Sequence, residues 1–110
     1  MYQLIFYVPH SHLESVKEAL FKAGAGRIGN YDCCAWQTLG DGQFRPLAKS
    51  NAFIGTKNEI AKVAEYKVEM VCSAATIKAV LQALISAHPY ETPAYCVFEI
   101  KTLEDFNKPD

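Results

Sequence analysis

Residues 2–8 read YQLIFYV and residues 66–72 read YKVEMVC, and the two stretches share one pattern. In both, every second residue is apolar, which is the period-2 pattern of a strand with one buried face. Placing Tyr2 on Tyr66 aligns the surrounding segments without a gap, at an offset of 64 residues. The chain therefore contains two related units, and each unit begins with a strand.

A helix is predicted after each of these strands. Apolar residues recur there at helical spacing, at Leu13, Val16, Leu20 and Ala23 and again at Ile77, Val80, Leu81, Leu84 and Ile85. Ser11 and Glu14 form a capping-box pattern for the first helix, and Ser73 is the expected N-cap of the second. Each helix leads to a further strand, expected over residues 32–39 and 94–100.

Two β-α-β units in tandem predict a ferredoxin-like α+β sandwich, an antiparallel sheet with two helices on one face. Parallel crossovers are right-handed, so the first strands of the two units are expected to be central neighbours. Between the units, Asp41-Gly42 predicts a β-hairpin insertion with a return strand over residues 43–47. Such a projecting hairpin suits ligand contact, subunit exchange or protection of an edge strand.

Length, charge and hydropathy limit the class of protein. The 110 residues predict one domain over residues 1–110, with residues 102–110 as a flexible tail. A net charge of −1 argues against a nucleic-acid-binding surface. No apolar run approaches the roughly 20 residues of a membrane helix, and the N-terminus lacks the features of a signal peptide. We therefore expect a cytoplasmic protein that binds neither nucleic acid nor membrane.

The four cysteines are predicted to be reduced. Cys33 and Cys34 are adjacent, which suits neither a disulfide nor the spacing of common zinc sites. Because they are expected to open a strand, one of the two should be exposed to a soft metal or to oxidation. Cys72 and Cys96 lie in apolar strand-like contexts, where a free cysteine packs as a small buried hydrophobe.

The stretch His88-Pro89-Tyr90-Glu91 ends the second predicted helix, because Pro89 cannot continue it. In a purely structural role, His88 interacts with the carbonyl end of the helix dipole. In a functional role, His88 and Glu91 are candidate ligands for a divalent metal, with the remaining ligands supplied by another subunit. On either interpretation, His88→Ala is expected to leave folding largely intact.

A second candidate site surrounds the predicted hairpin. Trp36, Phe44, Arg45 and Phe53, together with Tyr90, are candidates for contact with a small anionic ligand or for a subunit interface. No set of nucleophile, base and orienting residue is recognisable, so we expect no catalytic residue. A binding module, a purely structural or interaction module, and a metal-dependent enzyme remain as alternatives. The cofactor is left open, with a divalent metal as one option.

Three stretches together carry a family resemblance: GAGRIGNYDCCAW (residues 24–36), GDGQFRPL (40–47) and HPYETPAY (88–95). They resemble the small α/β domain inserted in many bacterial members of the NGG-one-interacting-factor-three family. The resemblance extends from the first strand to about Ile100 and implies a fold like that of the PII and CutA-like proteins. It also implies a homo-oligomer, with a trimer favoured and a dimer as the alternative, that binds small ligands or divalent metals at subunit clefts or in loops.

The resemblance carries no enzymatic activity with it, because the two-metal site of that family belongs to its other domains. Three positions depart from the family pattern: Lys49 replaces a usual glycine, Ala52 a usual proline and Cys96 a common aspartate. The first two changes indicate a different loop conformation. The third removes a carboxylate and weakens a metal site at that end of the chain.

Overall fold

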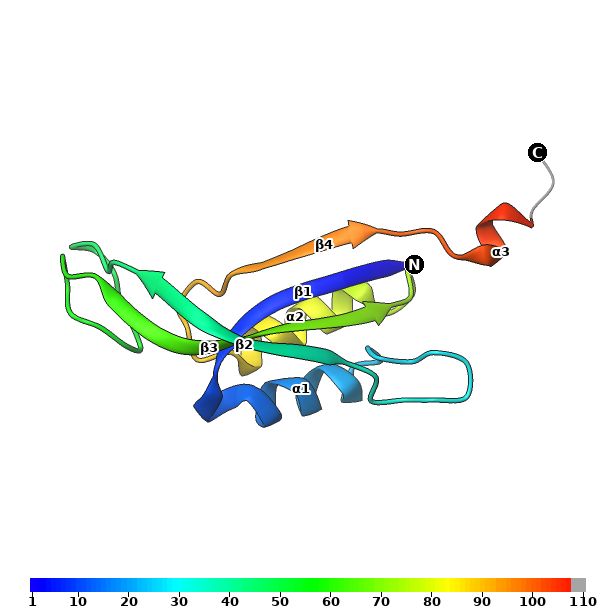
Figure 1. The fold of residues 1–110 in the computed structure, drawn as a ribbon, viewed down its shortest axis with the longest axis horizontal. Coiled ribbons are helices and arrows are strands. Elements are labelled where there is room, and N and C mark those ends of the chain that lie inside the picture. Colours follow the sequence, from blue (N-terminus) through cyan, green and yellow to red (C-terminus); the bar gives the residue numbers. More distant parts are fainter. Residues whose placement is uncertain (108–110) are drawn as a thin grey trace.

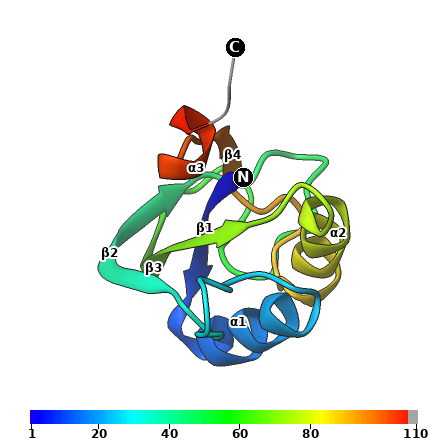
Figure 2. The same ribbon diagram turned by 90° about the vertical axis from the view of Figure 1, so that its right-hand side faces the viewer.

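The computed structural model describes residues 1–107, which form a ferredoxin-like α+β sandwich. The elements are β1 (Tyr2–Pro9), a 3-10 turn (His10–His12), α1 (Leu13–Lys22), β2 (Trp36–Phe44), β3 (Ala61–Cys72), α2 (Ile77–Ala87), β4 (Tyr95–Glu99) and α3 (Leu103–Phe106). The strands form one antiparallel sheet in the order β2-β3-β1-β4. Helices α1 and α2 cover one face of this sheet (Figures 1 and 2).

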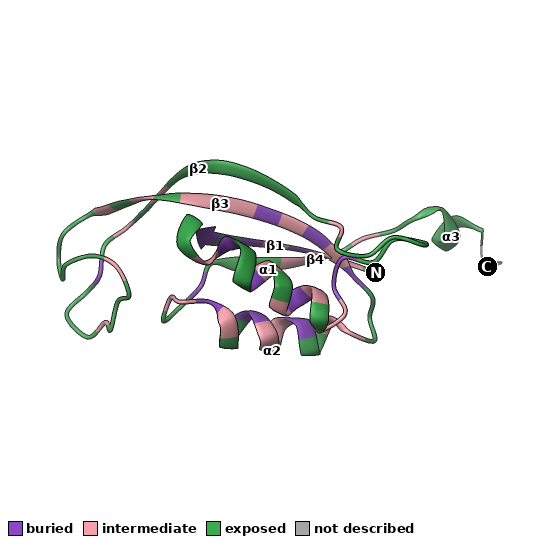
Figure 3. Ribbon diagram, turned by 90° about the horizontal axis from the view of Figure 1, so that it is seen from below, coloured by how far each residue is buried: buried purple, intermediate pink, exposed green. Residues whose placement is uncertain are grey.

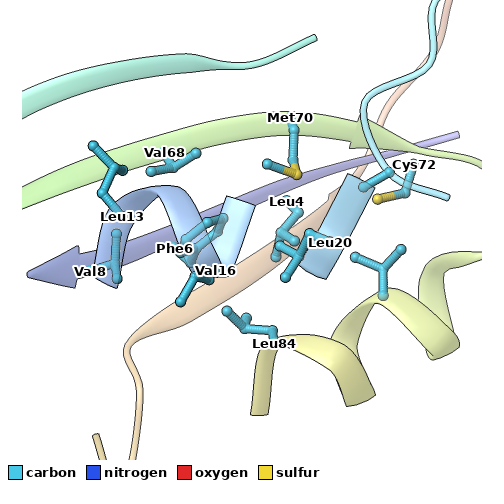
Figure 4. Packing of buried hydrophobic residues seen from close by; sticks show 12 residues of the cluster. Leu4, Phe6, Val8, Leu13, Val16, Leu20, Val68, Met70, Cys72 and Leu84 are labelled. Atoms are coloured by element: carbon cyan, nitrogen blue, oxygen red, sulfur yellow. The ribbon is translucent and has the colours of Figure 1, made fainter. Parts of the chain in front are cut away.

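The hydrophobic core confirms the repeat predicted from the sequence. The two stretches that begin the repeats are the central strands β1 and β3, and Phe6 pairs with Val68. Alternate residues of both strands point toward the helices (Figure 4), and they are Leu4, Phe6, Val8, Val68, Met70 and Cys72. The helices cover them with Leu13, Val16, Leu20, Val80 and Leu84. The predicted apolar stripe of α2 needs one correction: Ile85, expected to be buried, is 50% exposed.

Both predicted helix caps are wrong in detail. A 3-10 turn precedes α1, so His12 becomes the residue before the helix, and its side chain makes no cap bond. Ser11 instead pairs with the His12 ring, at 2.8 Å between Oγ and Nδ1. At α2 the cap position belongs to Thr76, whose hydroxyl lies 3.0 Å from that of Ser73. Local turns have shifted each helix start away from the serine that the pattern favours.

The hairpin turn predicted at Asp41-Gly42 is also wrong. β2 starts at Trp36 rather than at residue 32 and runs through both residues, with Asp41 opposite Ala64 and Gly42 opposite Val63. The long β3 offers backbone partners to all of β2, and this ladder outweighs the local turn preference. An insertion does project, because β1 pairs with β3 only as far as Glu65. Beyond that point β2 and β3 form a two-stranded ribbon, closed by the loop 45–60 (Figure 1).

The four cysteines are free thiols, and only some of their environments match those expected. Cys33 and Cys34 precede β2 rather than opening it; Cys33 is exposed with a φ of 54°, and Cys34 is half-buried. Cys72 is buried as predicted, and burial raises the pKa of its thiol. Cys96 is exposed, which corrects the expectation of a core position. It lies opposite Ile5, on the sheet face that the helices leave uncovered.

The end of the described chain stands apart from the body of the protein. Helix α3 projects beyond β4, and its residues are exposed (Figure 3). Thr102 starts this helix, and its backbone N–H donates to Asp105 Oδ2 at 2.8 Å. The predicted flexible tail includes residues 108–110, which lie outside the described residues, and its flexibility stays a prediction. In the described part of the chain, no helix is long and apolar enough to cross a membrane.

Candidate functional site

A cleft of about 700 Å³ lies between the β2–β3 ribbon, the loop 45–60 and the segment that follows α2. Its lining is aromatic and acidic. The aromatic residues are Tyr7, Phe44, Phe53 and Tyr90, and the acidic ones are Asp41, Glu65, Glu69 and Glu91. Among the described residues, Lys67 is the one basic side chain in this lining. The volume falls in the range of ordinary small-molecule sites.

The register of the sheet places this cleft on the face opposite the helices. Glu65, Lys67 and Glu69 alternate along β3 with residues that point into the core. They therefore point outward. Tyr7 lies opposite Lys67 on β1 and shares this outer face. The helices and the cleft are thus on opposite sides of the same two central strands.

Two glycines of β2 form part of the cleft wall and leave space in it. Gly40 lies opposite Glu65, and a Cβ atom built there would meet no other atom within 4 Å. A Cβ atom on Gly42 would instead overlap the carboxylate of Glu65. The Glu65 side chain therefore folds across the strand onto Gly42. Any larger residue at position 42 would push this carboxylate away from its present place.

His88 fixes the segment between α2 and β4 from inside the protein. Only 6% of its surface is exposed. Nε2 lies 2.6 Å from the carbonyl oxygen of Tyr7, and Nδ1 lies 3.1 Å from the backbone N of Tyr90. A carbonyl only accepts and an N–H only donates, so the ring is neutral with its hydrogen on Nε2. Burial lowers the pKa of His88, against smaller opposing effects of the Tyr7 carbonyl and Glu65.

The two predicted metal ligands lie close in sequence but have other partners. His88 uses both ring nitrogens for the backbone bonds described above. Glu91 Oε2 accepts from the backbone N–H of Asn51 at 3.0 Å, which links the loop 45–60 to the segment after α2. Within residues 1–107, no three His, Cys, Asp or Glu side chains are grouped to hold a metal. Metal binding by this pair stays a prediction, and it requires His88 to give up one of its bonds.

Tyr90 lies at the centre of the aromatic wall. Its ring centroid is 5.9 Å from that of Phe44 and 6.4 Å from that of Phe53. Its hydroxyl is buried, and no described residue meets it in regular hydrogen-bond geometry. Burial first, then the hydrogen-bonding contact with Glu65 and the charge of that carboxylate, raise the pKa of this hydroxyl. The phenol therefore stays protonated and can both donate and accept a bond inside the cleft.

The structure brings together some of the predicted site residues and separates others. Phe44, Tyr90 and Glu91 line the cleft, whereas Trp36 and Arg45 do not. Trp36 is 69% exposed on the outer sheet face, and Arg45 is exposed beside the ribbon. Phe53, also predicted, lines the cleft as well, whereas sequence reasoning missed Glu65. Gly40 and Gly42 could have indicated Glu65, because two glycines at alternate positions of a strand leave a gap on one face of the sheet.

We expect stability to fall on acidification because of His88. Its folded-state pKa lies below the ordinary value of 6.5, so the unfolded chain binds the proton more readily. The contribution of neutral His88 to the free energy of unfolding is therefore complete above pH 6.5, and it is lost as the pH falls through the folded-state pKa. Denaturant unfolding from about pH 8 to about pH 5 should show this loss, and His88→Asn should show a smaller one. An equal loss in both proteins would contradict the assignment.

Comparisons with known proteins identify the relatives of this chain. No family model matches it. The GTP cyclohydrolase 1 type 2 homolog of Halalkalibacterium halodurans is 41% identical over 100 residues, which cover 91% of this chain and 27% of that protein. The homolog of Mycobacterium leprae is 44% identical over 96 residues, or 87% of this chain and 25% of that protein. The chain thus spans about a quarter of the length of the curated relatives that it matches.

Solved structures place the fold. A Bacillus cereus protein related to NIF3 (NGG-one-interacting factor three) superposes with a TM-score of 0.78 at 34% identity, over 92% of this chain and 26% of that one. The PII-like protein CutA from Nostoc superposes with a TM-score of 0.67 over 96% of this chain and 89% of its own, and at 19% identity this likeness shows the fold alone. This chain therefore matches, over about a quarter of their length, proteins related to NGG-one-interacting factor three, and it has the fold of a PII/CutA-like domain.

Proposed function

We propose that this chain is a non-catalytic, homo-oligomeric binding module that holds a small ligand in the cleft beside the β2–β3 ribbon. The observation that carries this proposal is the cleft itself, whose volume of about 700 Å³ is lined by aromatic rings and a few polar groups. Binding sites for small molecules have this composition. The sheet, the loop 45–60 and the segment after α2 all contribute to its wall.

The outer face of the sheet supports self-association. It carries Trp36, Tyr7 and Phe98, which are 69%, 38% and 52% exposed. A sheet face in contact with water usually presents polar side chains, whereas aromatic residues are enriched at protein interfaces. Because the cleft opens on this same face, a second subunit packed there would lie beside the ligand. We favour a trimer, with a dimer as the alternative.

Native mass spectrometry of protein purified without a chelator tests both parts of the proposal. We expect a trimer that carries a stoichiometric extra mass, and this mass identifies the chemical class of the ligand. A protein that binds no small molecule from a metabolite mixture, whatever its oligomeric state, would refute the ligand-binding part. A monomer at micromolar concentration would refute the homo-oligomeric part.

Phe98→Asp should convert the oligomer into a folded monomer, because it places a charge in the proposed subunit contact. Leu103→Asp is the matched control, since Leu103 is 74% exposed on α3 and lies off the sheet. Light scattering after gel filtration measures the mass, and circular dichroism checks the fold. If Phe98→Asp keeps the mass of the unaltered protein, the outer face is not the subunit interface.

An interaction module without a ligand is the second candidate, and the exposed aromatic residues of the outer face favour it. In that case the face binds a different protein rather than another copy of this chain. A divalent metal at His88 and Glu91, and a cytoplasmic location, also remain proposals. A metal-dependent enzyme is the third candidate, and turnover sensitive to His88→Ala would be its signature.

A further inference from the structure

We propose that the cleft selects an organic cation, with a positively charged nitrogen at Glu65 and an apolar body against Phe44 and Phe53. This inference rests on the proposed ligand-binding function and names the class of ligand. It replaces the small anion that the sequence suggested through Arg45, because Arg45 lies outside the cleft.

The charges of the lining are the first argument. Glu65, Glu69 and Glu91 line the cleft with one lysine, and the fourth acidic residue of the lining, Asp41, lies opposite Ala64 with its side chain on the other sheet face. Two of these carboxylates have donors already: Glu69 accepts from Gln3 Nε2 at 3.2 Å, and Glu91 from Asn51 N at 3.0 Å. Glu65 is half-buried and interacts with the Tyr90 hydroxyl, but it forms no ion pair with any described residue. A half-buried carboxylate without a cation favours a ligand that supplies one, and it repels an anion.

The aromatic rings are the second argument. The ring centroids of Phe44 and Phe53 lie 5.9 Å and 6.4 Å from that of Tyr90. The faces of such rings carry partial negative charge and attract an ammonium or guanidinium group. The edges and faces also provide apolar contact for the rest of the ligand. An inorganic cation has no apolar body to pack against these rings, so they stabilise it less than they stabilise an organic cation.

The buried Tyr90 hydroxyl is the third argument. Its oxygen can accept a hydrogen bond, and a charged nitrogen placed between it and Glu65 can donate to both. The ligand would thereby add a hydrogen bond to a hydroxyl whose contact with Glu65 falls outside regular geometry. Burying such a group without a partner is unfavourable, so the bond formed on binding contributes to affinity.

The bare backbone at Gly40 is the fourth argument. A side chain at this position would project into open space within the cleft wall, because nothing lies within 4 Å of its Cβ position. Glycine in a strand often marks a place where a ligand approaches the backbone closely. Gly40→Val should therefore block the cleft while β2 keeps its register, since valine suits a strand.

Three probes of similar size and different charge test the proposal: phenethylamine, phenethyl alcohol and phenylacetate. Amide chemical shifts of the full chain at near-neutral pH report both affinity and place. We expect the amine to bind about tenfold more tightly than the alcohol, a difference of about 1.4 kcal/mol, with phenylacetate weakest. The shifts should centre on Gly40 and Gly42.

Matched variants separate the charge from the cleft. Glu65→Gln should bring the amine within about threefold of the alcohol and leave the alcohol unchanged, because it removes a charge but little volume. Glu99→Gln removes the same charge from an exposed position on β4 outside the cleft and should change nothing. Gly40→Val should weaken binding of both the amine and the alcohol.

Two results overturn the cation inference. Equal binding of all three probes in the cleft, or a preference for phenylacetate, contradicts it and leaves the ligand-binding function standing. If the protein shows no preference for the amine and zinc shifts the amide signals around Glu65, the site binds a metal ion rather than an organic cation. If neither the probes nor a wider set of small molecules shifts any cleft amide, the ligand-binding function fails as well.

Discussion

Leu84→Ala should lower the free energy of unfolding by about 2–5 kcal/mol. Leu84 is fully buried on α2 and points into the space between the two helices and the central strands (Figure 4). The substitution removes apolar contacts and leaves a cavity that the surrounding side chains fill only in part. Few other single changes in α2 combine these two losses, because its remaining apolar residues are mostly partly exposed.

Ile85→Ala is the control for this prediction. The residue is adjacent on the same helix, but half of its surface is exposed, so its truncation should cost less than about 1 kcal/mol. Urea unfolding of the two variants gives the comparison directly. If Leu84→Ala is no less stable than Ile85→Ala, the packing described for α2 is incorrect.

His88→Ala is expected to lower the free energy of unfolding by about 2–4 kcal/mol, which revises the expectation from sequence that folding stays largely intact. The change leaves the Tyr7 carbonyl and the Tyr90 N–H without their partner. Leaving one buried polar group unpaired costs about 1–3 kcal/mol, and water that enters the new space recovers part of this. The segment that carries Tyr90 and Glu91 should loosen with it.

His10→Ala provides the comparison, since His10 is exposed and contacts Tyr66 only through its ring. Unfolding midpoints measure the stability of both variants, and amide exchange of residues 90–94 measures the loosening. Stability equal to that of His10→Ala, with unchanged exchange of that segment, would remove the structural role assigned to His88.

Local periodicity explains why the central strands and helices could be predicted. Phe6 and Val68 lie in stretches where every second residue is apolar, which indicates a strand with one buried face. Leu84 belongs to a row of apolar residues at helical spacing. These patterns depend on neighbours along the chain, so the sequence contains them. No local pattern indicates that His88 is buried. The apolar stripe of the helix ends before this residue, and its partner Tyr7 is 81 residues away in the chain.

The cleft was harder to predict for the same reason. Asp41-Gly42 looks like a turn when taken alone, and only the pairing with Ala64 and Val63 makes it a strand. Phe53 reaches Tyr90 because the loop 45–60 folds back from the ribbon, which no local pattern in that loop indicates. The residue types around the predicted hairpin identified Phe44 and Tyr90 as site candidates. They could not show that these two line the cleft and that Trp36 and Arg45 lie outside it.

The pairing of β1 with β4 has a consequence for how this unit can be joined to other protein. Tyr2 lies opposite Glu99, and the Ile100 N–H donates to the Met1 carbonyl at 3.0 Å. Residues 1 and 100 are therefore separated by the width of one strand pair, about 5 Å. A surface turn of a larger protein could be cut and spliced to both residues without moving its flanking segments. The adjacency of these two residues therefore suits the insertion of this unit into a surface turn.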